Sequence, residues 1–140
     1  MRESYTIGDV MTPAPFAVEV DATLHQARSI LLRERIHHLP VVDRGFPIGL
    51  LTDRDLHLVS YLASDLMPEE EFMAGDICVP DPYIVGADTP MVTVAAVLAR
   101  DRIGAAMITK NNKLFGIFTT HDACRLLAVQ RREPAFVFAV

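Results

Sequence analysis

The sequence predicts an α/β protein made of two copies of one unit, each with a helix, two short strands and a second helix. The first observation is an internal repeat: an offset of 67 positions aligns residues 8–59 with residues 75–126 without a gap. The second is that stretches of helical hydrophobic spacing and short apolar runs follow one another in the same order in both copies. The third is size, because two such units account for nearly all of the 140 residues and leave no room for a separate catalytic domain.

The aligned copies agree at residues that set backbone geometry. The identical pairs include Pro13 and Pro80, Pro15 and Pro82, Gly49 and Gly116, Thr52 and Thr119, and Asp55 and Asp122. Unrelated segments would rarely match at both prolines, a glycine and a Thr-x-x-Asp site together. We therefore expect a first repeat over residues 1–63, a linker over 64–73, a second repeat over 74–132 and an apolar tail over 133–140.

In the first repeat, helix and strand signals are local and clear. Thr23 and Gln26 have the spacing of a capping box, and the apolar residues that follow recur at helical intervals. Residues 39–42 and 48–51 are short apolar runs joined by a Gly- and Pro-containing turn, which indicates two strands. A second helix is expected over residues 53–63.

The second repeat follows the same order. A helix is expected to begin at Pro90, because proline is tolerated in the first turn of a helix. Strands are expected over 106–109 and 114–118, and a last helix over 122–131. Residues 91–98 are apolar nearly all round, which is typical of a helix buried on two sides and suits a subunit interface. The linker is either solvated or begins a helix near Pro68, and the tail is expected to pack on its own domain or on a partner subunit.

Composition and charge exclude several classes of protein. The chain has 13 basic and 18 acidic side chains, and this formal charge of −5 without a clustered basic face argues against a nucleic-acid partner. Its apolar runs fall far short of the ~20 residues of a membrane helix, so we expect no membrane partner and a cytoplasmic location. Cys78 and Cys124 lack CxxC spacing, and buried thiols are expected rather than a disulfide.

A Thr-x-x-Asp motif closes the second strand of each repeat. It occurs at Thr52 and Asp55 and again at Thr119 and Asp122, where an apolar strand turns directly into a helix. One interpretation is structural: the hydroxyl and the carboxylate cap the helix by bonding free backbone N–H groups. The other is functional: a helix N-terminus attracts phosphate, and the carboxylate beside it can accept hydrogen bonds from ribose hydroxyls. Both can hold together, since Thr and Asp have spare acceptor capacity.

Four motifs of the first repeat together resemble the cystathionine β-synthase (CBS) domain, here present as a pair: D-V-M-T-P, T-L-x-x-A, I-H-H-L-P-V-V-D and G-L-L-T-D-R-D-L. The second repeat matches more loosely, with Met107 in place of Pro40 and Lys110 in place of Asp43. The resemblance implies two β-α-β-β-α repeats packed about a pseudo-two-fold axis, with sheets together, helices outside and two clefts between them. It also implies that the clefts bind an adenosyl ligand, either AMP, ADP or ATP or S-adenosylmethionine, for regulation, with no required cofactor.

The resemblance assigns ligand-binding roles residue by residue. Asp55 and Asp122 match ribose-binding acids, and Thr52 and Thr119 match hydroxyls that contact ribose or phosphate. Arg54 is similar to a basic residue often aimed at phosphates. These five positions are the core of the expected site.

Three histidines extend this assignment. His121 occupies in the second repeat the place of the phosphate-facing basic residue, and His37 and His38 fall where the family often has a basic pair. The second repeat has glycine and alanine at the latter positions, so the two clefts are expected to be chemically unequal.

Apolar residues complete the expected site. Met11, Ile36 and Pro40 are candidates for the walls around an adenine ring. Ordinary core packing is the alternative for all three, because buried apolar residues most often serve the core.

Other chemistry finds no support in the sequence. It contains no H-x-x-E-H, C-x-x-C, G-x-S-x-G, Walker or G-x-G-x-x-G motif, so we expect neither a metal site nor an enzyme. Adjacent histidines on a strand point to opposite faces, which argues against joint chelation by His37 and His38.

Two hypotheses for the function remain. The first is a regulatory module that senses an adenosyl ligand, forms a homodimer through its helices and acts on an unknown partner in trans. The second is a ligand-free scaffold for dimerisation or protein interaction, in which the clefts are empty. Binding of an adenosyl compound discriminates between them.

Overall fold

The computed structural model describes residues 5–63 and 68–130. In the first half of the chain the elements are α1 (Ile7–Val10), β1 (Thr12–Pro13), β2 (Val18–Glu19), α2 (Leu24–Glu34), β3 (His38–Asp43), β4 (Phe46–Thr52) and α3 (Asp53–Leu62). After a 3-10 turn at Glu69–Glu71 the second half contains α4 (Ala74–Ile77), β5 (Val79–Pro80), β6 (Ile84–Gly86), α5 (Met91–Asp101), β7 (Ala105–Lys110), β8 (Lys113–Thr119) and α6 (Thr120–Gln130).

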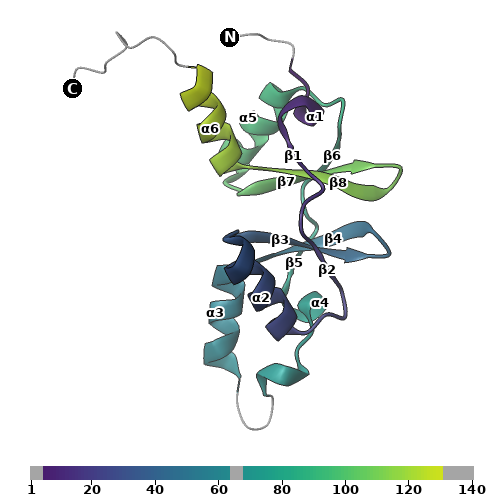
Figure 1. The fold of residues 1–140 in the computed structure, drawn as a ribbon, viewed down its shortest axis with the longest axis vertical. Helices are drawn as coiled ribbons and strands as arrows, with labels where there is room; N and C mark the ends of the chain where they lie inside the picture. The colour runs from purple at the N-terminus through teal and green to yellow at the C-terminus, as the bar shows by residue number, and fades with distance from the viewer. Residues whose placement is uncertain (1–4, 64–67, 131–140) are drawn as a thin grey trace, which may run out of the picture.

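Two four-stranded sheets form the centre of the molecule, and helices lie outside them (Figure 1). One sheet has the order β2-β3-β4-β5 and the other the order β6-β7-β8-β1. In each, the first pair is parallel and the other two pairs are antiparallel. The two orders are the same when the repeats are exchanged, as the pseudo-two-fold arrangement requires. The predicted fold class is therefore confirmed.

The two repeats exchange their first segments, so that each of these segments packs on the other repeat. The strand β1 pairs with β8 of the second repeat, and β5 pairs with β4 of the first. The small helices follow the same rule, because Ile7 of α1 is buried in the core of the second repeat and Ala74 of α4 in that of the first. The contiguous repeats expected from the sequence are thus interlocked, and neither sheet is complete without the other half of the chain.

Close approach of the exchanged segments depends on two glycines. A Cβ at Gly49 would lie 2.9 Å from the carbonyl oxygen of Val79 and would collide with the side chain of Cys78. A Cβ at the equivalent Gly116 would collide with the side chain of Met11. At Gly49, a glycine leaves space for the backbone of the exchanged strand.

The longer elements begin and end close to where the sequence placed them. Both predicted strand pairs are present, and Thr23 accepts a hydrogen bond from the N–H of Gln26, forming the expected capping box. The acidic run after Pro68 forms a single 3-10 turn. None of the helices in the described part of the chain has the length and apolar composition that a membrane crossing requires.

Some local expectations need correction. Cys78 is half-buried, but Cys124 is exposed, because it lies on the outer face of α6. The helix α5 buries Met91, Val94 and Leu98, whereas Val92 is 55% exposed in the single chain. The tail expected over residues 133–140 lies outside the described residues.

Candidate functional site

The Thr-x-x-Asp motifs form helix caps at the inner ends of α3 and α6. Oδ2 of Asp55 accepts hydrogen bonds from the N–H and the hydroxyl of Thr52, both at 2.9 Å, and the Thr52 hydroxyl accepts from the N–H of Asp55 at 3.2 Å. Asp122 and Thr119 repeat this pattern, with a backbone bond of 2.8 Å. The structural interpretation of the motif is therefore confirmed.

The two carboxylates differ at their second oxygen. Oδ1 of Asp122 accepts a hydrogen bond from Arg125 at 3.0 Å and a long one from the hydroxyl of Thr12 at 3.5 Å. Leu58 and Val79 occupy the equivalent positions around Asp55 and can donate nothing. Within the described residues, Oδ1 of Asp55 has no hydrogen-bond donor, so it is free to accept one from a ligand.

One cavity, which we call the histidine cleft, has a volume of about 320 Å³. Its lining residues come from β1 and the segment after it, the segment from the end of α2 to the start of β3, and the junction of β8 with α6: Thr12, Pro13, Ala14, Pro15, Phe16, Arg35, Ile36, His37, His38, Ile117, Thr119, His121 and Asp122. The cleft therefore combines the first repeat with the Thr-x-x-Asp motif of the second. Its size falls within the range of about 300–1,000 Å³ that is common for small-molecule sites.

A second cavity, the aspartate cleft, has a volume of about 450 Å³. Its lining residues are Leu50, Thr52, Val79, Pro80, Asp81, Pro82, Tyr83, Val97, Asp101, Ile103, Gly104 and Ala105. Nearly every one of them lies 67 positions from a residue of the histidine cleft. The two cavities are thus equivalent under the pseudo-two-fold relation, and their chemical differences come from substitutions between the repeats.

Histidines 37 and 38 lie in different surroundings. Nδ1 of His37 is 2.8 Å from Oδ2 of Asp53, and this hydrogen bond lowers the pKa of the Asp53 carboxyl. Burial lowers the pKa of His38, and the charge of His37 lowers it further. A Cβ at Gly104 would lie only 2.6 Å from Nε2 of His38. The His38 ring therefore stands between the two clefts, since Gly104 lines the other one.

Both histidines line the same cleft, which corrects the expectation that they face opposite sides. The reason is that β3 begins at His38, so strand alternation does not extend to His37. Within the described residues, no group of three or more His, Cys, Asp or Glu side chains is arranged to hold a metal ion.

The predicted site residues separate into two groups. The histidine cleft brings together six of them: Ile36, His37, His38, Thr119, His121 and Asp122. Thr52 lines the aspartate cleft, and Asp55 is bonded to it.

Besides Asp55, three predicted residues line neither cleft. Arg54 is exposed on α3, and Met11 packs against Gly116 and the core of the second repeat. Pro40 is fully buried in β3, opposite Leu50 of β4. For Met11 and Pro40 the structure therefore favours the alternative of ordinary packing.

Sequence reasoning missed several lining residues. Arg35, Phe16, Tyr83 and Asp81 belong to segments with no helical or strand periodicity. The repeat alignment could have found them, because Phe16 and Tyr83 occupy equivalent positions, as do Ala14 and Asp81.

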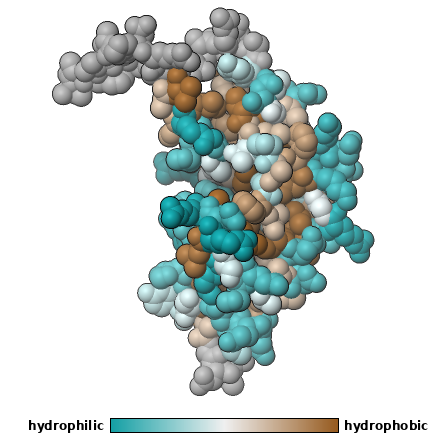
Figure 2. Space-filling model, in the orientation of Figure 1, coloured by the Kyte–Doolittle hydropathy of each residue, from teal (hydrophilic) through white to brown (hydrophobic). Residues whose placement is uncertain are grey.

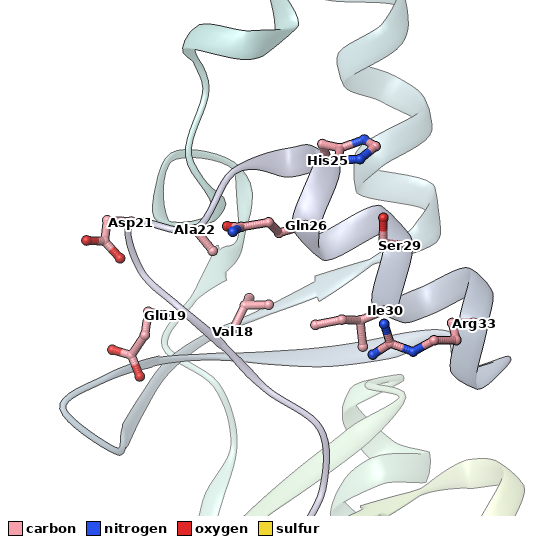
Figure 3. Close-up of a pocket in the computed structure, with 9 residues that line it drawn as sticks. All are labelled: Val18, Glu19, Asp21, Ala22, His25, Gln26, Ser29, Ile30 and Arg33. Atoms are coloured by element: carbon pink, nitrogen blue, oxygen red, sulfur yellow. The ribbon is translucent and has the colours of Figure 1, made fainter.

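A third hollow lies between β2 and α2, outside both clefts (Figure 3). Val18 and Ile30 face each other across it, whereas Glu19 and Asp21 point away from the helix (Figure 3). With polar groups that diverge, this hollow lacks the convergent donors and acceptors of a specific ligand site.

Comparison with known proteins finds the same family in both repeats. The model of the CBS domain family matches residues 7–60 and 74–129. The chain belongs to the CBS domain family. A CBS domain-containing protein of Dictyostelium discoideum is 29% identical over 139 residues, covering 91% of this chain and 94% of the relative.

A solved structure shares the arrangement of this CBS pair. The crystal structure of CBSX2 in complex with AMP is similar with a TM-score of 0.77 and 25% identity, over 91% of this chain and 99% of that one. Enzymes also occur among the relatives. L-aspartate semialdehyde sulfurtransferase of Methanocaldococcus jannaschii is 26% identical over 122 residues, 86% of this chain, but the match spans only 23% of the enzyme.

Proposed function

We propose that this CBS pair is a regulatory module that binds an adenosyl ligand in the clefts between its repeats and acts on a partner protein in trans. The observation that carries the proposal is the pair of equivalent cavities, each bordered by a Thr at a helix N-terminus. An exposed helix N-terminus favours phosphate, and the neighbouring carboxylate suits ribose hydroxyls. A cytoplasmic location stays a prediction.

The geometry supports a ligand of this kind. Aromatic and apolar residues, Phe16 and Ile36 in one cleft and Tyr83 and Ile103 in the other, offer surfaces for a purine ring. The structure of the similar protein CBSX2 is a complex with AMP, which lends support to the same class of ligand for this chain. Regulation then requires that the ligand bind one arrangement of the pair more tightly than another.

Amide chemical shifts test the proposal directly. In a titration of the ¹⁵N-labelled chain with AMP, we expect shifts at residues that line a cleft, with Ile117 and Tyr83 as reporters of the two clefts. The amide of Gln26, which lines neither cleft, serves as the internal control. If the amide chemical shifts of the cleft residues do not change at millimolar AMP, the proposal is refuted for this ligand.

A second candidate function, a dimerising scaffold, is favoured by exposed apolar residues on the helices. Val92, Leu127 and Val129 are 55%, 62% and 59% exposed, and apolar side chains gather over α5 and α6 in Figure 2. On the opposite half, Tyr61 and Leu62 of α3 are 77% and 74% exposed. We infer a homodimer that packs through these helix faces, an arrangement compatible with ligand sensing.

The two functions predict different behaviour of the same protein. A scaffold dimerises and binds none of the adenosyl compounds, whereas a sensor binds them whether or not it dimerises. Sedimentation velocity measures dimerisation, and the titration with AMP measures binding. A monomer at micromolar concentration would contradict the homodimer.

A further inference from the structure

The two equivalent clefts differ in the charged and titratable residues that line them. Arg35, His37, His38 and His121 line the histidine cleft, where the single acid, Asp122, is already bonded to Arg125. Such a lining favours a negative ligand, because Arg35 and the histidine rings offer N–H donors and Asp122 is paired with Arg125.

The aspartate cleft has the reverse character. Asp81 and Asp101 line it, and none of its lining residues is basic. Arg100 pairs with Asp101 at 2.8 Å, but Asp81 has no ion-pair partner in the described part of the chain. Asp55 does not line the cleft itself, but it is bonded to the lining residue Thr52 and adds an acid beside the cavity.

The basic residues of the first cleft have no basic counterparts among the lining residues of the second, because Arg102, the equivalent of Arg35, is exposed at the end of α5 and lies outside that lining. Gly104 and Ala105 replace the histidine pair, and Asp81 replaces Ala14. Arg54, which is equivalent to His121, is exposed on α3 and lines neither cavity. A phosphate placed in the aspartate cleft would therefore meet acids and no lining cation, an arrangement that like-charge repulsion disfavours.

We propose that the clefts divide adenosyl ligands by charge: the histidine cleft holds a phosphorylated one, and the aspartate cleft holds an uncharged or cationic one. S-adenosylmethionine is such a cationic ligand, because it has a sulfonium group in place of the phosphate of AMP. The inference rests on the proposed function, since it assumes that both clefts bind an adenosyl group. It adds that one chain binds two different ligands at once.

Competition calorimetry tests this division. The full chain is titrated with AMP, with adenosine and with S-adenosylmethionine, and then with S-adenosylmethionine after saturation with AMP. We expect one AMP and one S-adenosylmethionine per chain, with the affinity for each unchanged within about threefold when the other is bound. Displacement of one ligand by the other would overturn the proposal.

Variants that exchange equivalent residues identify the cleft. Asp81→Ala is expected to weaken S-adenosylmethionine about three- to tenfold, because one facing charge is lost, and to leave AMP unaffected. His37→Gly is expected to weaken AMP by a similar factor and to leave S-adenosylmethionine unaffected. The matched control is Asp88→Ala, which removes an exposed acid that lines neither cleft. A lower affinity for AMP in Asp81→Ala would also overturn the charge division. So would a lower affinity for AMP in Arg54→Ala together with an unchanged affinity in His37→Gly.

The outcomes separate the two proposals. If none of the three compounds binds, the proposed function itself fails. If they bind but compete for one cleft, or if both clefts take AMP, adenosyl binding stands and the division by charge is wrong.

Discussion

The free carboxylate oxygen of Asp55 makes the sharpest prediction for the site. Oδ2 is used by the cap at Thr52, and Oδ1 has no donor among the described residues, so a ribose hydroxyl can bond to it without breaking any contact. A hydrogen bond to a charged acceptor contributes about 1.5–3 kcal/mol. Asp55→Ala should therefore weaken the ligand of the aspartate cleft by about ten- to a hundredfold.

The assay must separate this loss from a loss of helix capping. Gln26→Ala is the matched control, because Gln26 accepts a hydrogen bond from the N–H of Thr23 in the capping box of α2 and lines neither cleft. Both variants should lose a similar part of the stability, about 1 kcal/mol, in urea denaturation.

Calorimetry with AMP and with S-adenosylmethionine then gives the affinities. We expect Asp55→Ala to bind one of the two compounds about ten- to a hundredfold more weakly and to keep its affinity for the other, whereas Gln26→Ala keeps both affinities. If Asp55→Ala binds both compounds with unchanged affinity and stoichiometry, the role of Asp55 in ligand binding is refuted.

Three further predictions concern the stability of the fold and the dimer interface. Gly49→Ala should destabilise the chain by about 1–3 kcal/mol in urea denaturation, because the new methyl meets Val79 and Cys78 of the exchanged strand, and unchanged stability would argue against that contact. Burial lowers the pKa of His38, so the unfolded chain binds a proton that the folded chain does not, and stability should fall as the pH drops below about 6.5. The fall should be shallower in His38→Ala, and an identical pH profile would contradict the assignment. Leu127→Glu should shift the sedimentation equilibrium toward monomer, and a dimer of unchanged strength would exclude the α5–α6 face from the interface.

The longer elements could be predicted because their signals are local. The capping boxes at Thr23 and Thr52 fix where helices begin, and the apolar runs around Gly49 fix the strands within a few residues. Such signals depend on residues three or four positions apart, which a single sequence displays directly.

The exchange of β1 and β5 could not be predicted in this way. Each strand has two residues, too few for any periodicity, and each pairs with a strand far along the chain. The sequence does contain a trace of the exchange in Gly49 and Gly116, but a conserved spacing of glycines does not say which segment approaches them.

The residues that line each cleft could not be predicted either, because they come from parts of the chain that are far apart in sequence. The sequence shows that His37 and Thr119 exist, but only the interlocked fold places them in one cavity. The charge difference at Ala14 and Asp81 is visible in the repeat alignment, yet it gains meaning only when both residues are seen to line equivalent cavities. The candidate residues could thus be predicted from the sequence, but their grouping into two cavities could not.

The central claim is that the clefts bind adenosyl ligands, and thermal unfolding of the unmodified chain with a panel of these compounds tests it most directly. At a concentration one hundred times its dissociation constant, a ligand that binds only the folded state adds about 2.7 kcal/mol of stability. For a domain of this size, AMP, ADP, ATP or S-adenosylmethionine should then raise the Tm by several degrees. An unchanged Tm with every member of the panel at millimolar concentration would contradict the account and leave the scaffold as the function of the pair.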